Sequence, residues 1–255
     1  MTRNISASIV TFNNVAQVSG LLDSMQRYAD LQELELFVID NASSDGTAEL
    51  LSNHYPWVKL LSNTQNRGFG AAHNQVLPLL PSRYHVLINP DIVFTEDALT
   101  PLFSYLDEHP ETAMITPRIL NSDGSEQKLP KLQPRPRYVV ARRFEQRFAW
   151  AKRLCSEYVR ADEDFTEPTE IENCTGSFCV IRTEIFRQIN GFDECFFLYF
   201  EDNDLSLRAH EHGNLIFYPQ AAVVHHYRRE AMSSTRAFLR QIRSMLHYFN
   251  KHGWT

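Results

Sequence analysis

The chain has 255 residues, of which 43% are hydrophobic and 22% charged, as in an ordinary soluble globular protein. The length suits one large α/β domain or two small ones, with ample chain to bury a core. No apolar run approaches the roughly 20 residues of a membrane span, and the first residues lead into a strand without a signal-like apolar region, so membrane-spanning and secreted classes are disfavoured.

The four cysteines have no regular spacing and no Cys-x-x-Cys pair; they are Cys155, Cys174, Cys179 and Cys195. This usage indicates neither a zinc knuckle nor a disulfide framework, and we expect a reduced, cytoplasmic compartment.

The formal charge of −6 is unevenly distributed. Nine Lys or Arg residues lie between Lys128 and Arg153 against the single acid Glu145, and six follow His225 against Glu230. Such basic regions on an acidic protein indicate a surface that meets anions, such as phospholipid headgroups or a phosphorylated acceptor. A solvated basic face is an equally open interpretation. Nothing points to nucleic acid.

The first ninety residues alternate strand and helix patterns. Strands are predicted at Ile5–Phe12, Leu34–Ile39, Val58–Leu61 and Tyr84–Ile88, and helices at Val15–Tyr28, from Ala48, and from the end of the loop Asn63–Asn74 to about Leu80. This alternation predicts βαβ units, a parallel sheet and the α/β fold class.

The pattern is looser afterwards. A helix is predicted at Glu96–Glu108 with Glu96 and Asp97 in its first turn, an edge strand at Ala113–Leu120 because of Pro117, and a turn at Asn121–Gly124. The stretch Leu129–Glu170 is the least regular and contains one basic, aromatic helix candidate at Tyr138–Tyr158. A strand at Phe178–Arg182 and a helix at Thr183–Ile189, ended by Asn190-Gly191, follow.

Asn89-Pro90-Asp91 stands at the end of the fourth strand. Pro90 lacks an N–H and so terminates the strand, which delivers Asp91 to the carboxyl edge of the sheet, where open α/β sheets bind ligands. A carboxylate beside an Asn carbonyl suits a hard divalent cation, which in turn holds a diphosphate. A simple turn aspartate is the alternative.

Further acids fall at predicted strand ends and loops: Asp40 with Asp45, and Glu201-Asp202 with Asp204. Several converging acids favour a functional site over a solvated face. Glu201-Asp202 follows the aromatic run Phe196–Phe200, and burial beside aromatic rings raises a carboxylate pKa toward that of a useful general base. An acidic helix-capping turn remains the alternative there.

The loop Asn66-Arg67-Gly68-Phe69-Gly70 invites comparison with a dinucleotide-binding fingerprint, because it follows a strand and opens a helix. His73 replaces the third glycine and the loop follows the third strand, so this fingerprint is weak. Small residues still allow close backbone approach to a nucleotide, and Arg67 offers a fork for phosphate. His225, at the end of a strand before His226, is a candidate to complete a metal site with Asp91.

The chain resembles family 2 glycosyltransferases of the GT-A fold, and among them the bacterial rhamnosyltransferase-like group. The matching residues run in family order: Val-Thr-Phe-Asn13, Val-Ile-Asp-Asn-Ala-Ser-Ser-Asp-Gly-Thr47, Asn66-Arg-Gly-Phe-Gly-Ala-Ala-His-Asn74, Asn-Pro-Asp91, Thr-Gly-Ser-Phe178, Gly-Phe-Asp193, Phe-Glu-Asp-Asn-Asp-Leu-Ser-Leu-Arg208 and His225.

The resemblance implies one GT-A domain over 1–255, with a nucleotide-sugar-binding half at 1–95 built on a Rossmann-like sheet and an acceptor-binding half with the catalytic base at 96–255. It implies that Asp40 reads the base, that Asp202, next to Glu201, is the catalytic base, and that Asp91 and His225 hold Mg²⁺ or Mn²⁺. Implied donor-binding residues are Thr11, Asn13, Asp40, Asn41, Asp45, Asn66, Arg67, Gly68, Gly70, Asn74, Asn89 and Asp91, and implied acceptor-binding residues are Thr175, Gly176 and Ser177. Asn89 departs from the acid of the general Asp-x-Asp motif.

The expected activity is therefore inverting transfer of a sugar, with dTDP-L-rhamnose as the preferred donor, to a saccharide acceptor. We expect a lipid-linked acceptor at the inner face of the cytoplasmic membrane, peripheral membrane association, and a role in bacterial cell-surface polysaccharide synthesis. Two other classes remain open: a nucleotide-dependent oxidoreductase using the Gly-Phe-Gly loop, and a sugar-nucleotide-binding protein without catalysis.

Overall fold

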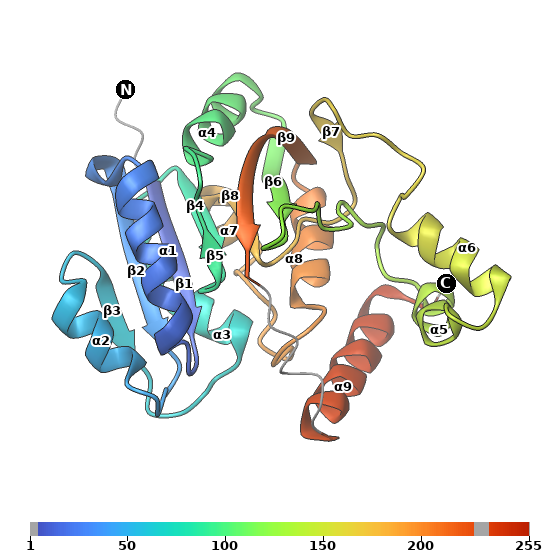
Figure 1. The fold of residues 1–255 in the computed structure, drawn as a ribbon, viewed down its shortest axis with the longest axis horizontal. Helices are drawn as coiled ribbons and strands as arrows, with labels where there is room; N and C mark the ends of the chain where they lie inside the picture. The colour runs from blue at the N-terminus through green and yellow to red at the C-terminus, as the bar shows by residue number, and fades with distance from the viewer. Residues whose placement is uncertain (1–4, 227–234, 255) are drawn as a thin grey trace.

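The protein is described by a computed structural model that covers residues 5–226 and 235–254. One nine-stranded sheet runs through it in the order β3-β2-β1-β4-β8-β6-β9-β5, with β7 paired to β9 outside this path. Figure 1 shows helices α1 and α2 at the left, beside β1 to β3, and α5, α6 and α9 at the right.

The strands are β1 (Ile5–Thr11), β2 (Leu34–Asp40), β3 (Lys59–Ser62), β4 (Tyr84–Ile88), β5 (Ile92–Val93), β6 (Thr112–Leu120), β7 (Thr169–Glu170), β8 (Phe178–Arg182) and β9 (Asn214–His225). The α-helices are α1 (Val15–Tyr28), α2 (Thr47–His54), α3 (Phe69–Asn74), α4 (Leu99–Glu108), α5 (Pro136–Phe144), α6 (Ala149–Tyr158), α7 (Thr183–Gln188), α8 (Glu201–His210) and α9 (Thr235–His252).

The first four strands are parallel neighbours, as the alternating pattern predicts. All five residues of β4 are buried, because β1 lies on one side of this strand and β8 on the other. The carboxyl ends of β1, β2 and β4 therefore meet at one edge, and the polar residues that follow them are brought together there. The helix predicted between Asn74 and Leu80 is wrong: α3 lies within the predicted loop and ends at Asn74, and only a 3₁₀ turn at Leu77–Leu79 follows it.

The prediction of an edge strand around Pro117 is wrong. Strand β6 lies between β8 and β9 and is therefore central. Its pairing with β8 covers only Met114 and Ile115, and its register with β9 shifts between Pro117 and Arg118. Pro117 is tolerated because it lies beyond the stretch paired with β8, next to an irregularity in the ladder.

Two predicted helices also need correction. The stretch predicted as one helix over Tyr138–Tyr158 contains α5 and α6, separated by residues 145–148. Helix α4 begins at Leu99, and Asp97 precedes it: the Asp97 carboxylate accepts hydrogen bonds from the backbone N–H groups of Leu99 and Thr100, at 3.1 and 3.0 Å. Asp97 therefore acts as a cap and not as a residue of the first turn.

Within the described residues, no helix combines the length and apolar character that crossing a bilayer requires.

Candidate active site

A cavity of about 480 Å³ opens at the strand ends. Five of the predicted donor-binding residues line it: Asn41, Asn66, Gly68, Asn89 and Asp91. The rest of its wall comes from Val10, Phe12, Asn14, Phe69, Pro90, Phe197, Leu198, Tyr199, Ala237 and Arg240. Residues from the far half of the chain thus complete a cavity that begins at the parallel strands, and the cavity is large enough for part of a nucleotide sugar.

Asn41 organises the polar side of this cavity. Its amide nitrogen donates to Asn66 Oδ1 at 3.0 Å and to the Gly68 carbonyl at 3.1 Å. Its amide oxygen accepts from Asn63 Nδ2 at 3.1 Å and from the Arg67 backbone N–H at 3.0 Å. One buried side chain therefore ties the end of β2 to the glycine-containing loop and fixes its shape.

The glycines of that loop are required by protein packing. A Cβ at Gly68, where φ is +90°, would lie 2.6 Å from the Phe197 carbonyl oxygen, and one at Gly70 would lie 2.6 Å from Phe192 Cβ. The expectation that these small residues admit a nucleotide is therefore incomplete, because both allow close approach of the segment 192–197. Gly68 lines the cavity and Gly70 is buried behind it.

Asp40 and Thr11 form a buried pair at the ends of β2 and β1. Thr11 Oγ1 donates to Asp40 Oδ1 at 3.1 Å, and the Ser43 backbone N–H donates to Asp40 Oδ2 at 3.0 Å. Both carboxylate oxygens thus have protein donors, and only 2% of Asp40 is exposed. Recognition of a base by Asp40 stays a prediction.

The other predicted donor residues are not among those lining the cavity. Asp45 accepts hydrogen bonds from the backbone N–H groups of Val15 and Thr47 and so joins the starts of α1 and α2. Asn13 accepts from the Ser44 N–H at 2.8 Å. Asn74 holds both the N–H and the carbonyl of Phe192, at 2.8 and 2.9 Å.

Arg67, expected to bind phosphate, extends toward Glu194 at 4.0 Å and is also absent from the cavity wall.

Asp91 and His225 meet as expected. His225 Nε2 lies 3.1 Å from Asp91 Oδ1, because β5 pairs with β9 and sets Ile92 opposite His225. The turn that presents Asp91 is anchored by a hydrogen bond from the Asn89 N–H to the Ser177 carbonyl, at 2.8 Å. A carboxylate and an imidazole at the edge of a cavity, with Asn89 beside them, fit a divalent cation whose other ligands come from substrate and water.

A second cavity, of about 260 Å³, contains the acidic pair. Its wall consists of Leu129, Lys131, Pro134, Tyr138, Val139, Arg142, Tyr158, Asn173, Thr175, Tyr199, Phe200, Glu201, Asp202, Asn203 and Gln241. Of the predicted acceptor residues, Thr175 lines this cavity, Gly176 touches Asp202, and Ser177 Oγ lies 3.1 Å from Thr175 Oγ1. Tyr199 belongs to both cavities, so the two adjoin at this residue.

The Asp202 carboxylate is oriented by backbone donors. The Gly176 N–H donates to Oδ2 at 3.2 Å, and the Asn203 N–H donates to Oδ1 at 2.9 Å. Burial raises the pKa of Asp202 above its ordinary value, and these two N–H groups and the nearby Lys131 cation oppose the rise. A carboxylate with a raised pKa is a stronger base than an exposed one, which is the property that the sequence interpretation assigned to this residue.

Glu201 plays a different part from its neighbour. It is 7% exposed, and its Oε2 is buried without a hydrogen-bond partner among the described residues. Burial and the adjacent Asp202 raise the pKa of Glu201. A proton on Glu201 would remove the repulsion between the two carboxylates.

The backbone that leads into these acids is strained. Tyr199 and Phe200 both have positive φ, at +73° and +69°, a left-handed conformation that costs a non-glycine residue on the order of 1–3 kcal/mol. The two left-handed residues place Glu201 and Asp202 in the first turn of α8. Such strain clusters at functional sites, and it is a feature that sequence periodicity did not reveal.

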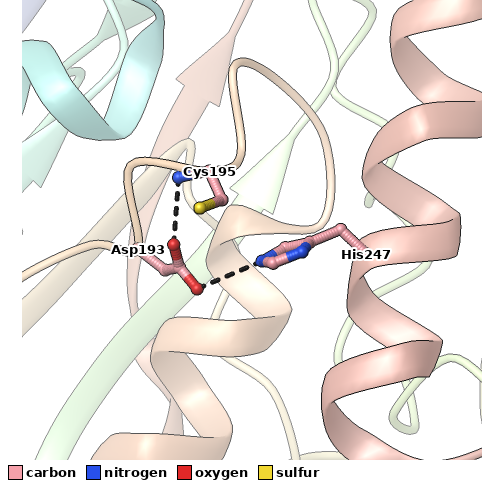
Figure 2. Close-up of side chains that lie close together, drawn as sticks. All are labelled: Asp193, Cys195 and His247. Carbon is pink, nitrogen blue, oxygen red and sulfur yellow. Dashed lines mark hydrogen bonds and ion pairs between the residues drawn. The ribbon is translucent and has the colours of Figure 1, made fainter.

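The remaining acids of these motifs, Asp193 and Asp204, clamp helix α9. Asp193 Oδ2 accepts from Lys251 Nζ at 2.6 Å. The same oxygen lies 3.2 Å from His247 Nε2 (Figure 2). Asp204 is fully buried and contacts Lys251, His252 and Arg208. The interpretation of Asp204 as a member of an acidic cluster at the site is therefore wrong, because its carboxylate pairs with cationic side chains of α8 and α9.

The geometry of Asp193, Cys195 and His247 would also allow a metal ion. However, the ammonium group of Lys251 already lies against the Asp193 oxygen that would serve as the ligand. These residues are better explained as an ion-pair cluster than as a metal centre.

Comparison with known proteins agrees with this geometry. The model of glycosyl transferase family 2 matches residues 6–189, and a model described as the N-terminal domain of galactosyltransferase matches residues 157–230. The chain belongs to glycosyltransferase family 2.

Two curated relatives are rhamnosyltransferases. The chain is 28% identical over 244 residues to N-acetylglucosaminyl-diphospho-decaprenol L-rhamnosyltransferase of Mycobacterium tuberculosis, covering 89% of this chain and 77% of the relative. It is 26% identical over 255 residues to the rhamnosyltransferase WbbL of Escherichia coli, covering 94% and 90%. Within its family the chain is thus rhamnosyltransferase-like, and it is a glycosyltransferase.

Solved structures with the GT-A fold superpose on most of the chain. GalNAc-T7 with UDP, GalNAc and Mn²⁺ gives a TM-score of 0.67 at 16% identity, covering 95% of this chain and 47% of that one. S. aureus TarS 1–349 with UDP-GlcNAc gives 0.67 at 16% identity, covering 96% and 66%. The chain thus spans half to two thirds of these solved chains, and at this identity they show that its fold is GT-A.

Proposed function

We propose that this chain is an inverting glycosyltransferase that moves L-rhamnose from dTDP-L-rhamnose to a saccharide acceptor, with Asp202 as the catalytic base. The observation that carries the proposal is Asp202, oriented by two backbone N–H groups in a cavity that adjoins the strand-end cavity at Tyr199. The donor would bind at the strand ends and the acceptor beside Asp202. The expected division into a donor half at 1–95 and an acceptor half at 96–255 remains a prediction. Residues of both halves line the donor cavity.

In the proposed reaction, an acceptor hydroxyl gives its proton to Asp202. Its oxygen then forms a bond to the anomeric carbon as the bond from that carbon to the diphosphate oxygen breaks, and the electron pair leaves with the diphosphate. Attack from the side opposite the leaving group inverts the anomeric configuration. Asp91 and His225 would hold a Mg²⁺ or Mn²⁺ ion, which when bound supplies positive charge to the departing diphosphate.

The relatives support the choice of sugar and acceptor. Both curated relatives carry rhamnosyltransferase in their names, and the mycobacterial name describes a polyprenyl-diphosphate-linked acceptor. For this chain we infer a lipid-linked saccharide of bacterial cell-surface polysaccharide synthesis, reached at the cytoplasmic face of the membrane. The basic helices α5 and α6 beside the acceptor cavity suit this role, since Tyr138, Val139 and Arg142 line that cavity.

A panel of sugar nucleotides tests the donor. dTDP-L-rhamnose should raise the melting temperature more than UDP-GlcNAc or GDP-mannose, because a ligand stabilises in proportion to the logarithm of its concentration over Kd. Release of dTDP in the presence of a lipid-linked saccharide should follow. If NADH raises the melting temperature and no sugar nucleotide does, the result would instead support a nucleotide-dependent oxidoreductase.

Metal dependence is tested separately with the nucleoside diphosphate. We expect dTDP to bind more weakly in EDTA than with Mn²⁺, and Asp91→Ala to abolish the difference between the two conditions. Calorimetry of wild type and variant, each with and without EDTA, provides the four affinities. Equal affinities of wild type in both conditions would show that Asp91 holds no metal needed for donor binding, and would make Asn89 the decisive departure from the general motif.

A further inference from the structure

Helix α9 supplies a cation to the donor cavity. Ala237 and Arg240 lie on its wall with Asn89 and Asp91. Among the described residues that line this cavity, Arg240 is the one lysine or arginine and Asp91 the one acid. No ion pair joins Arg240 to another described residue, so the guanidinium group keeps its donors for a ligand.

Arg240 is positioned by a contact with an aromatic ring of the cavity wall. Its Cζ lies 4.2 Å from the centre of the Phe197 ring, a contact that orients the guanidinium plane. One turn further along α9, Ser244 Oγ donates to the Leu198 carbonyl at 2.9 Å. The helix is therefore attached to the segment that contributes Phe197, Leu198 and Tyr199 to the cavity wall.

The far end of α9 is fixed by charge. Lys251 contacts both Asp193 and Asp204 at 2.6 Å, and His252 lies 2.7 Å from Asp204. Since Asp204 belongs to α8, this clamp ties α9 to the helix that begins with Glu201 and Asp202. The cation at the donor cavity and the catalytic carboxylates are thus positioned by one packed unit.

We infer that Arg240 binds the diphosphate of the nucleotide-sugar donor, and this inference rests on the proposed function. A guanidinium fork matches two phosphate oxygens, and the cavity otherwise offers a diphosphate no positive side chain among its described residues. Asn89 is neutral, whereas the general motif has an acid there that helps to hold the metal ion. A side chain that adds positive charge beside the metal therefore suits this site. Arg67, the residue expected to have this role, lies outside the cavity wall.

The test compares Arg240→Gln with Arg243→Gln, a change of equal charge on the same helix at an exposed position outside both cavities. Calorimetry measures binding of whichever of dTDP, UDP and GDP wild type binds most tightly, and of the matching nucleoside. Arg240→Gln should weaken nucleoside diphosphate binding about 10- to 100-fold, as expected for lost hydrogen bonds to a charged group, and leave nucleoside binding unchanged. Arg240→Lys should lie between, because it retains charge and loses the fork.

Nucleoside diphosphate binding by Arg240→Gln within twofold of Arg243→Gln would overturn the inference while leaving the proposed function in place. Equal weakening of nucleoside and nucleoside diphosphate would also overturn it, since that pattern indicates a distorted cavity. Failure of wild type to bind any of the three nucleoside diphosphates would overturn the proposed function as well.

Discussion

Asp202 and Glu201 are adjacent in the chain, yet their surroundings divide their roles. Asp202 meets two backbone N–H groups and a nearby lysine, while an oxygen of Glu201 is buried without a partner in the described structure. Two neighbouring buried carboxylates rarely ionise together, because each charge opposes the other. The two backbone N–H groups on Asp202 favour Asp202 as the charged member of the pair, because Glu201 Oε2 has no such donor among the described residues.

Replacing Asp202 with asparagine tests the base. Asp202→Asn should reduce kcat at least about a hundredfold, because the amide keeps the shape of the side chain but accepts no proton, and general-base effects are typically 10²–10⁴-fold. Donor affinity, measured with dTDP by calorimetry, should stay within a few-fold of wild type. A variant that retains more than about a hundredth of the wild-type kcat would remove Asp202 from this role.

At the scale of the element, two glycines in helices differ in the space around them: one is packed closely and the other has room for a methyl group. Gly70 lies against Phe192, whereas Gly20 lies inside α1 with its nearest outside neighbour, Val93 Cγ2, at 3.8 Å from a built Cβ. Gly20→Ala should therefore stabilise the protein by up to about 1 kcal/mol, since alanine favours the helix and meets no clash. Gly70→Ala should destabilise it by about 1–3 kcal/mol through overpacking.

Urea unfolding of the two glycine variants beside wild type measures both free energies. Because the substitution is the same, the difference between them isolates the packing around each glycine. A Gly70→Ala protein as stable as wild type would contradict the prediction, because it would mean that Phe192 moves aside at no cost in stability.

The elements were predictable where one interaction dominates. The apolar run in β4 and the stripe in α1 depend on burial alone, and both elements have the predicted bounds. The edge-strand prediction from Pro117 failed because a missing N–H matters only where a neighbouring strand would accept its hydrogen bond. The pairing of β8 with β6 ends before Pro117. The number of neighbours of a strand is set by the whole sheet, which local pattern does not contain.

The candidate site was predictable to the same degree. Asp91 with His225, and Glu201 with Asp202, were found because they stand at strand ends or beside aromatic residues. Arg240 was missed, since its helix carries no motif and is placed at the cavity by tertiary contacts, among them the clamp at Lys251 and the contact with Phe197. Asp204 was misassigned because sequence shows an acid but not the cations that neutralise it.

Across the whole molecule, a row of buried polar side chains links the sheet to α3. His73 Nδ1 lies 2.7 Å from Ser8 Oγ, which lies 2.8 Å from His85 Nε2, and His85 Nδ1 lies 2.8 Å from Ser6 Oγ. Burial lowers the pKa of His85 to about 3 and that of His73 well below its ordinary value, so both rings are neutral in the folded state.

The two buried histidines predict how the free energy of unfolding depends on pH. In the unfolded state each imidazole takes up a proton below about pH 6.5, and the folded state does not. The unfolded state therefore binds more protons, and each histidine contributes stability above pH 6.5 that is lost by about 1.4 kcal/mol per pH unit below it. Urea unfolding from pH 7.5 to 5 should show a shallower decline for His85→Gln than for wild type. Glu201, whose raised pKa gives the opposite slope, is unchanged in both proteins, so parallel curves would contradict the prediction.

The last prediction concerns a surface on α5 and α6 that we propose binds a membrane. Three aromatic residues at the junction of α5 and α6 are exposed and pack on one another: Phe144, Phe148 and Trp150. Tyr138 of the same stretch is buried, so these three aromatic residues differ from it in facing solvent. An exposed aromatic cluster among arginines suits an interface with anionic lipid.

Arg143→Gln with Arg147→Gln should weaken sedimentation with anionic liposomes, most clearly at low salt, where charges are least screened. Each cation near such a surface contributes on the order of 1 kcal/mol, so losing two should reduce binding roughly 10- to 30-fold. Arg142 is kept, because it lines the acceptor cavity. The matched control is Arg27→Gln with Lys59→Gln, two exposed cations on α1 and β3 at the opposite side of the molecule (Figure 1), which should sediment like wild type. If wild type fails to sediment with these liposomes even at low salt, the aromatic junction meets something other than a membrane, and the acceptor must reach Asp202 from solution.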